Sequence, residues 1–223
     1  SRSDGSALLC KPRAECAILV MLDVSSVRFN PRLQTLSKIC EAKMRSICVF
    51  CGSSDGSDAR FAKLAEDTGR ELARKGLRLV YGGAEAGLMG RMARAALDEG
   101  GEVLGVIPEF LIPLEGLQDG VEPRITATLA SRKAIMVEEA DGFLVLPGGA
   151  GTLEEIFDMI MLRQLGRHQK PAAFVDADFW GPLETLLLRV VDAGFAQDDV
   201  IRTISFHPEA GAAIERLQSE WAS

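Results

Sequence analysis

The chain of 223 residues is long enough to bury a substantial core within one domain. Its composition, 47% hydrophobic and 26% charged, is ordinary for a soluble globular protein. A net charge of −7 disfavours non-specific nucleic-acid binding, which needs a basic surface, so we expect no nucleic-acid partner.

Residues 1–43 differ in character from the rest of the chain. An apolar run over Cys16–Leu22 is interrupted by Asp23, too early for a membrane span, and no convincing signal cleavage site comes after it, which leaves a secretory signal as the weaker alternative. We predict that residues 1–43 are a leader or an expression-derived extension outside the domain, which comprises residues 44–223. The expected protein is cytoplasmic and has no membrane partner.

The cysteines and histidines predict neither disulfides nor a metal. Five cysteines, three of them before residue 44, do not make a disulfide framework. Cys48 and Cys51 form a lone C-x-x-C at the end of a predicted strand, without the second pair that a zinc site needs. We expect reduced, structural cysteines. His168 and His207 have no partners at ligand spacing and are expected on the surface or in loops.

From Ser46 onward the sequence alternates between strand and helix patterns. Predicted strands are Ser46–Phe50, Leu77–Tyr81, Glu102–Ile107, Phe143–Leu146, Pro171–Val175 and Thr203–Phe206. Predicted helices are Phe61–Ala73, Leu88–Glu99, Thr128–Ala140, a segment opening at Thr152, Trp180–Ala193, and a last one opened by Pro208. Phe110–Thr126 contains two prolines, two glycines and several acids, and is expected to be an ordered loop or lid at the sheet edge. This alternation predicts a single α/β domain with a doubly wound parallel sheet.

Loops rich in glycine or serine follow three of these strands, and ligands of such sheets bind at the carboxyl ends of strands. The first loop contains Gly52 and Ser53, the second contains Gly82, Gly83, Gly87 and Gly90, and the third contains Gly148, Gly149, Gly151 and Thr152. We expect the three loops to converge on one site.

The third loop has the arrangement that binds phosphate: a buried strand, a glycine turn and a helix N-terminus, where unpaired N–H groups and the helix dipole meet. Glu154 occupies the last glycine position of a G-x-G-x-x-G pattern, and no Lys-Ser/Thr pair follows, which excludes the dinucleotide and Walker A fingerprints. A monophosphate with an acid beside it is the expected ligand. The alternative is that Thr152 and Glu155 form only a capping box.

Two basic residues interrupt the apolar face of the helix over Thr128–Ala140. Arg132 and Lys133 occupy positions where aliphatic residues belong. Their stems could reach solvent, or they could pair with acids such as Glu139. In the other interpretation Arg132 points into the cleft above the glycine turn, where its planar guanidinium can hold phosphate or ribose oxygens.

The motif P-G-G-A-G-T-L-E-E, preceded by S-R-K-A-I-M and, earlier, by C-V-F-C-G-S-S and Y-G-G-A-E-A-G-L-M-G, resembles the LOG ("lonely guy") family from about Met44 to the C-terminus. These proteins are cytokinin riboside 5′-monophosphate phosphoribohydrolases, and many bacterial members carry the misleading label of lysine decarboxylase. The resemblance implies a Rossmann-like fold, a homodimer, and hydrolysis of the N-glycosidic bond of a nucleoside 5′-monophosphate without a cofactor or metal.

By position, the catalytic arginine and glutamate of the family match Arg132 and Glu155. The glycine turn with Thr152 matches the family's phosphate cradle, and Gly82, Gly83, Gly87 and Gly90 match a second ligand-facing loop. We also expect Gly52, Ser53 and Lys133 to bind the substrate. Where family members commonly have Met-His before x-R-K, this chain has Leu129-Ala130, a departure that bears on base preference.

The residue types fit this chemistry. Breaking a ribosyl C–N bond develops positive charge at the anomeric carbon, which a carboxylate such as Glu155 can stabilise, or it can draw a proton from the attacking water. We assign no catalytic role to Glu154, which lies roughly 100° around the helix from Glu155. Alternatives are a non-catalytic nucleotide or molybdenum-cofactor carrier, since such carriers resemble this family, and a broader purine nucleoside monophosphate nucleosidase.

Overall fold

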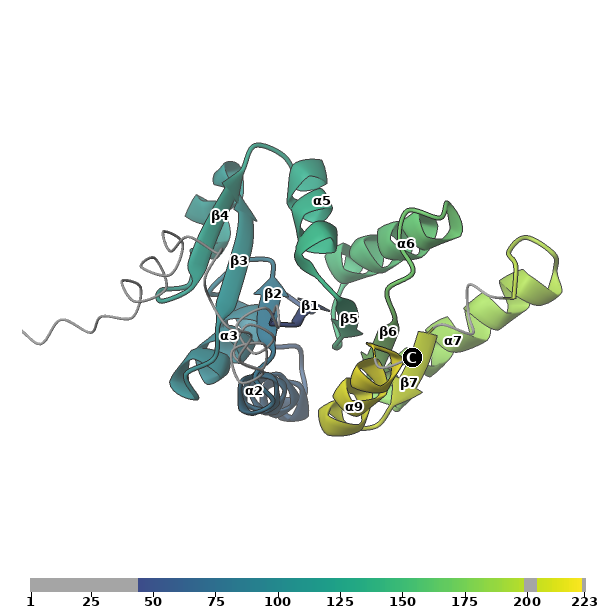
Figure 1. The fold of residues 1–223 in the computed structure, drawn as a ribbon, viewed down its shortest axis with the longest axis horizontal. Coiled ribbons are helices and arrows are strands. Elements are labelled where there is room, and N and C mark those ends of the chain that lie inside the picture. Colours follow the sequence, from purple (N-terminus) through teal and green to yellow (C-terminus); the bar gives the residue numbers. More distant parts are fainter. Residues whose placement is uncertain (1–43, 199–203, 222–223) are drawn as a thin grey trace, which may run out of the picture. The chain divides into compact units, whose positions relative to one another are not determined.

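The computed structural model describes residues 44–198 and 204–221, which belong to one compact unit around a seven-stranded parallel sheet (Figure 1). The strands are β1 (Ser46–Phe50), β2 (Arg78–Tyr81), β3 (Val103–Pro108), β4 (Glu122–Thr126), β5 (Gly142–Val145), β6 (Ala172–Val175) and β7 (Ile204–His207). The helices are α2 (Ala59–Arg74), α3 (Gly87–Asp98), α4 (Ile112–Glu115), α5 (Leu129–Glu139), α6 (Ala150–Gln164), α7 (Ala177–Asp192) and α9 (Ala210–Trp221), with a 3₁₀ turn, η2 (Glu109–Leu111).

Helices cover both faces of the sheet, which explains why its central strands are apolar throughout. Every residue of β1 is buried, and successive side chains of the strand enter two different cores. Ile47 and Val49 pack with α2, α3 and α9, whereas Cys48 and Phe50 pack with α5, α6 and α7. Figure 1 shows these two helical layers on opposite sides of the sheet. The predicted doubly wound parallel sheet is therefore confirmed.

The strand order is β4-β3-β2-β1-β5-β6-β7, and the side of the sheet on which successive strands are added changes at β1. The chain moves outward from β1 through β2, β3 and β4, and then returns to the other side of β1 with β5. The loops after β1 and β5 therefore leave toward opposite faces and open a crevice at the carboxyl ends of these strands, as in other sheets of this class. The backbone N–H of Gly52 donates to the carbonyl of Pro147 at 3.1 Å, which ties the two loops together at the crevice.

The structure corrects the predicted loop over Phe110–Thr126. The segment contains the end of η2, helix α4 and strand β4, which pairs in parallel with β3. Only its place at the sheet edge was predicted correctly. A proline in a five-residue segment hides the strand pattern, but Pro123 is tolerated because an edge strand leaves one side unpaired.

The other differences are at element ends and in buried polar residues. α7 begins three residues before the predicted Trp180, because Asp176 caps it by accepting a hydrogen bond from the N–H of Phe179 at 3.2 Å. His168 is in a loop as expected but is buried, and His207 ends β7 instead of lying in a loop. Cys48 and Cys51 are buried free thiols, as predicted.

Several sequence predictions lie outside the described residues, namely those on residues 1–43, including their three cysteines, and on Thr203. Within residues 44–198 and 204–221, no helix is both long enough and apolar enough to cross a membrane.

The contact between α2 and α3 generates a test of the fold. A Cβ at Gly69 would lie 2.1 Å from the backbone oxygen of Met92, so Gly69→Ala must push the two helices apart. We expect a loss of about 1–3 kcal/mol in the free energy of unfolding, as for other overpacked cores. Urea denaturation should show a lower midpoint with an unchanged m-value.

Gly211→Ala in α9 is the matched control, because the nearest atom to its added Cβ is 4.0 Å away. It should lose no stability, since alanine is the better helix former. Equal stability of the Gly69→Ala variant and the wild type would contradict this account of the helix contact.

Candidate active site

The N-terminus of α6 offers backbone N–H groups without side-chain partners. The helix begins at Ala150 with Gly149 as its N-cap; no side chain accepts a capping hydrogen bond, and no acid occupies the first turn. The first N–H groups of a helix have no partner within the helix, and they meet the positive end of its dipole. The glycine turn after β5 can therefore hold an anion.

Close packing explains why a glycine begins this turn. A Cβ at Gly148 would lie 2.1 Å from Oγ1 of Thr152 and 3.0 Å from the backbone nitrogen of Gly52. Any larger residue would separate the glycine turn from α6 and from the loop after β1. Gly148 thereby brings two of the three predicted loops into contact.

A capping box positions Arg132 on α5. The hydroxyl of Thr128 accepts from the N–H of Ser131 at 3.0 Å, and the hydroxyl of Ser131 accepts from the N–H of Thr128 at 3.2 Å. Reciprocal capping fixes the first turn of the helix. Arg132 follows directly, and its N–H donates to the carbonyl of Thr128 at 3.1 Å.

The two predicted catalytic side chains meet across the crevice. Nη2 of Arg132 donates to Oε1 of Glu155 at 2.9 Å, and the side chains are only 9% and 11% exposed. Gly82 makes room for this pair, because a Cβ there would lie 2.3 Å from Nη2 of Arg132. Nε of the guanidinium is buried and has no hydrogen-bond partner among the described residues.

The capping box that the sequence left open is wrong, whereas Arg132 and Lys133 do pair with acids, although not with Glu139. Thr152 lies inside α6 and is not its N-cap, so Thr152 and Glu155 do not form a capping box. Glu139, the acid suggested for Arg132, instead binds Arg78 and Arg124 at 3.0 and 2.6 Å.

Burial changes the proton affinity of Glu155. Desolvation raises the pKa of its carboxyl to about 7, with the Arg132 guanidinium opposing the shift. The charges of Glu154 and Glu115 raise the pKa further, whereas that of Lys133 lowers it. A carboxyl group that titrates near neutral pH in a cleft is typical of acid–base sites.

Arg132 and Glu155 line a cavity of about 460 Å³. Its wall consists of Cys51–Ser54 after β1, Met89 of α3, Glu115 of α4, Leu129 and Arg132 of α5, and Gly149–Thr152, Glu154 and Glu155 at the start of α6. Five of the predicted binding residues thus share one cavity with the ion pair: Gly52, Ser53, Gly149, Gly151 and Thr152. Among the described residues, no group of three or more His, Cys, Asp or Glu is placed to hold a metal ion.

The other predicted binding residues do not line this cavity. Lys133 forms ion pairs with Glu154 and with Asp158, the latter at 3.2 Å, and so connects α5 to α6. Gly83, Gly87 and Gly90 allow close packing: Cβ atoms there would lie 2.9, 2.3 and 1.8 Å from Ile107, Ser53 and Glu85, respectively.

Seven lining residues were not predicted as site residues: Cys51, Ser54, Met89, Glu115, Leu129, Ala150 and Glu154. Met89 occupies a position within the second glycine loop that a helical pattern assigns to the core. Glu115 was hidden in the segment predicted to be a loop or lid. Only the acids noted in that segment could have pointed to it.

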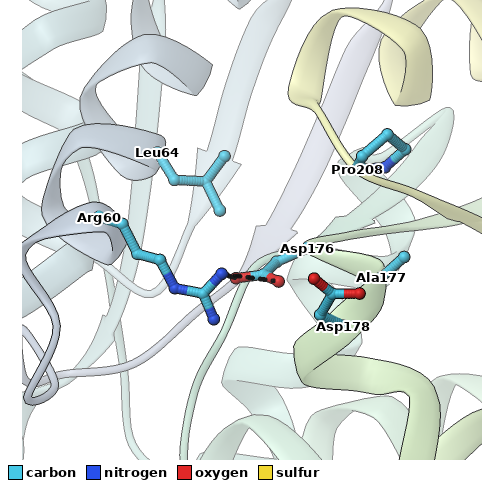
Figure 2. Close-up of a pocket in the computed structure, with 6 residues that line it drawn as sticks. All are labelled: Arg60, Leu64, Asp176, Ala177, Asp178 and Pro208. Atoms are coloured by element: carbon cyan, nitrogen blue, oxygen red, sulfur yellow. Dashed lines mark hydrogen bonds and ion pairs between the residues drawn. The ribbon is translucent and has the colours of Figure 1, made fainter.

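A second hollow, of about 230 Å³, lies between the start of α2 and the start of α7 (Figure 2). Arg60 reaches across it to Asp176, with Nη1 3.3 Å from the carboxylate, and also binds Asp58 at 3.1 Å. Asp176 is buried and caps α7 with a left-handed φ of 71°. Since two carboxylates already neutralise this guanidinium, the hollow is a poorer anion site than the cavity at α6.

Comparisons with known proteins agree with this geometry. Residues 89–217 match the protein family described as "Possible lysine decarboxylase". The chain is 40% identical over 179 residues to the cytokinin riboside 5′-monophosphate phosphoribohydrolase LOG of Oryza sativa subsp. japonica, which covers 79% of this chain and 74% of that protein. It is 42% identical to the cytokinin riboside 5′-monophosphate phosphoribohydrolase of Rhodococcoides fascians, over 72% of this chain and 83% of that protein. The solved molybdenum cofactor carrier protein of Chlamydomonas reinhardtii shares the fold, with a TM-score of 0.64 and 20% identity over 81% of this chain and 100% of that chain.

The raised pKa of Glu155 predicts a pH-dependent stability. Between its ordinary value of 4.5 and about 7, the native state holds this proton more tightly than the unfolded state, so the free energy of unfolding falls as pH rises through that window. Glu155→Gln removes this effect. The stability of the variant relative to wild type should therefore increase by roughly 3 kcal/mol between pH 4.5 and pH 8, at about 1.4 kcal/mol per pKa unit.

Urea unfolding of both proteins across this pH range measures the difference. Glu138→Gln, an exposed position on α5, is the control and should follow the wild type. If the wild type and Glu155→Gln had parallel pH profiles, the pKa of Glu155 would not be raised.

Proposed function

The chain belongs to the LOG family of cytokinin riboside 5′-monophosphate phosphoribohydrolases, and we propose that it hydrolyses the N-glycosidic bond of adenosine 5′-monophosphate, plain or N6-modified. The products are the free base and ribose 5-phosphate. The observation that carries the proposal is the Arg132–Glu155 pair in a cavity that also contains the first turn of α6. The proposed domain for this activity is residues 44–223.

The phosphate is proposed to bind at the glycine turn. The first N–H groups of α6 supply donors without a competing acid, and Gly52 and Ser53 face the same space from the loop after β1. Binding of the phosphate, which does not take part in the reaction, holds the ribose in position for the reaction at the C–N bond. Gly148 supports the phosphate-binding turn through close packing. Gly82, Gly83, Gly87 and Gly90 support the site in the same way, and Lys133 does so by joining α5 to α6.

Glu155 is placed one turn into α6, where the ribose of a phosphate-anchored nucleotide would follow. As the C–N bond breaks, its electron pair leaves with the base, which takes up a proton, and the anomeric carbon gains positive charge. The ionised Glu155 stabilises that charge or removes a proton from the water that adds to the carbon. Arg132 orients the carboxylate, and its Nε–H is available to a phosphate or ribose oxygen.

The assay is release of free base from AMP and from isopentenyladenosine monophosphate, followed by chromatography. Glu155→Gln should lower kcat by roughly 10²–10⁴-fold, the range for lost acid–base groups. Since the free enzyme needs an ionised Glu155, kcat/KM should rise with pH up to about 7 and then level off.

Glu138→Gln serves again as the control and should retain full activity. Tight nucleotide binding without turnover would identify a carrier instead of an enzyme. Comparable turnover of GMP and IMP would identify a broader purine nucleoside monophosphate nucleosidase.

We also propose that the protein is a homodimer in the cytoplasm. An apolar stripe runs along α6 at intervals of four residues: Leu153, Phe157, Met161 and Leu165 are 37%, 41%, 47% and 65% exposed. Residues four apart lie on one helix face, and a continuous exposed apolar face is typical of protein contacts. The buried free thiols of Cys48 and Cys51 are compatible with a reducing compartment.

Phe157→Glu tests the dimer. A charge in the middle of the stripe should convert the protein to a monomer in sedimentation or light-scattering measurements, because an unpaired charge at an interface is costly to bury. Leu188→Glu, at an exposed apolar position on α7, should leave the oligomeric state unchanged. A monomeric wild type would refute the dimer.

A further inference from the structure

We propose that Glu115 determines base specificity by accepting a hydrogen bond from the exocyclic 6-amino group of an adenine-type base. This inference rests on the proposed binding of a nucleoside monophosphate in the cavity of Arg132 and Glu155.

Glu115 is the unpaired carboxylate of the cavity. Three acids line it, namely Glu115, Glu154 and Glu155. Glu155 is bound by Arg132, and Glu154 is bound by Lys133. Glu115 has no ion pair among the described residues, and its Oε2 is buried without a hydrogen-bond partner. Since a buried polar atom left unsatisfied is costly, such an atom on a cavity wall indicates that a ligand supplies its partner.

The backbone around Glu115 is fixed, so the carboxylate is part of a formed site. Gly116 ends α4 with a positive φ of 72°, and its N–H donates to the carbonyl of Ile112 at 3.0 Å. Two residues further on, the N–H of Gln118 donates to the carbonyl of Gly83 at 3.2 Å, which ties the segment to the loop after β2. A Cβ at Gly116 would overlap the side chain of Glu85, at 2.3 Å, so this turn is closely packed.

The place of Glu115 along the carboxyl edge of the sheet fits the order of phosphate, ribose and base in a nucleotide. The glycine turn follows β5, whereas α4 follows β3, three strand positions away in the order β3-β2-β1-β5. At about 4.8 Å between strands, this is a separation of roughly 14 Å along the carboxyl edge. Arg132 packs beside Gly82 at the end of β2, which lies between β3 and β5 in the sheet, and holds Glu155 there. A phosphate at the turn and a ribose at Glu155 therefore direct the base toward Glu115.

A carboxylate recognises hydrogen-bond donors, because it accepts but does not donate when ionised. Adenine presents an amino donor at position 6, where guanine presents an acceptor oxygen. An N6-monosubstituted adenine keeps one N–H, so the same contact serves plain and N6-modified substrates. It is lost when position 6 bears hydrogen or a dialkylamino group.

The test is equilibrium binding to the Glu155→Gln protein, which separates recognition from turnover. AMP and N6-methyl-AMP should bind roughly 10- to 100-fold more tightly than purine riboside 5′-monophosphate and N6,N6-dimethyl-AMP, the range for one hydrogen bond to a charged group. Adding Glu115→Ala should bring the four dissociation constants to within about threefold. Glu115→Gln should reduce the preference only in part, since an amide oxygen still accepts.

Ribose 5-phosphate, which lacks the base, is the internal reference and should bind equally with and without Glu115→Ala. Glu109→Ala, an exposed acid at the start of the same segment, should keep the preference. A preference that persists in Glu115→Ala would mean that shape selects the base, and equal weakening of ribose 5-phosphate would place Glu115 at the sugar. Tighter binding of GMP than of AMP would indicate recognition of the guanine N–H edge. Each of these three results overturns the inference.

The proposed hydrolysis is judged separately, by release of base from AMP with the wild type. Loss of the 6-amino preference with hydrolysis intact would overturn only the role of Glu115. A clear preference without hydrolysis would leave that role standing and overturn the enzyme.

Discussion

One buried ion pair constrains how the two helices over the crevice are placed. Removing a carboxylate and a guanidinium from water costs several kcal/mol per ion, and their attraction offsets that cost only when the geometry is good. Arg132 and Glu155 reach 2.9 Å because other contacts have already fixed α5 and α6: the capping box at Thr128, the absent side chain at Gly82, and the bridge from Lys133 to α6. An apolar pair at these positions often serves stability equally well, so the charges favour the proposed catalytic role over a purely structural one.

The sheet determines where that pair can act. Because the sheet changes its direction of winding at β1, the helices that follow β1 and β5 cover opposite faces, and a crevice opens between them at the carboxyl edge. The N-terminus of α6 opens onto this space, and Glu155 follows one turn later on the same helix. The amides proposed to bind the phosphate and a carboxyl group with a raised pKa are thereby held at a fixed separation by a single helix.

The sequence predicted the parts of this arrangement that depend on local pattern. Buried strands, glycine turns and the alternation of elements are local signals, and the strand–turn–helix after β5 was found from them. The ion pair of Arg132 with Glu155 joins residues 23 positions apart on different helices, and it was not predicted, although the family resemblance named both residues as catalytic. β4 was missed because an edge strand with a proline carries no clear period. Glu115 was missed because its helix, α4, has only four residues and shows no helical period either. Lys133 was expected at the ligand because periodicity cannot tell which of two adjacent basic residues faces the cavity and which faces α6.

The glycines around the cavity fall into two physical groups, and the difference bears on the proposed phosphate site. At Gly148, Gly82 and Gly87 a Cβ would overlap atoms of the protein, so packing within the chain accounts for the missing side chain. At Gly149 and Gly151 nothing lies within 4 Å of the position of a Cβ, and neither residue has a positive φ. Gly149 is the N-cap of α6, a position where glycine is favoured, whereas Gly151 lies in the first turn, where a glycine costs about 1 kcal/mol relative to alanine. Both residues line the cavity, and the close approach of an anion that we propose there would account for the glycine at position 151.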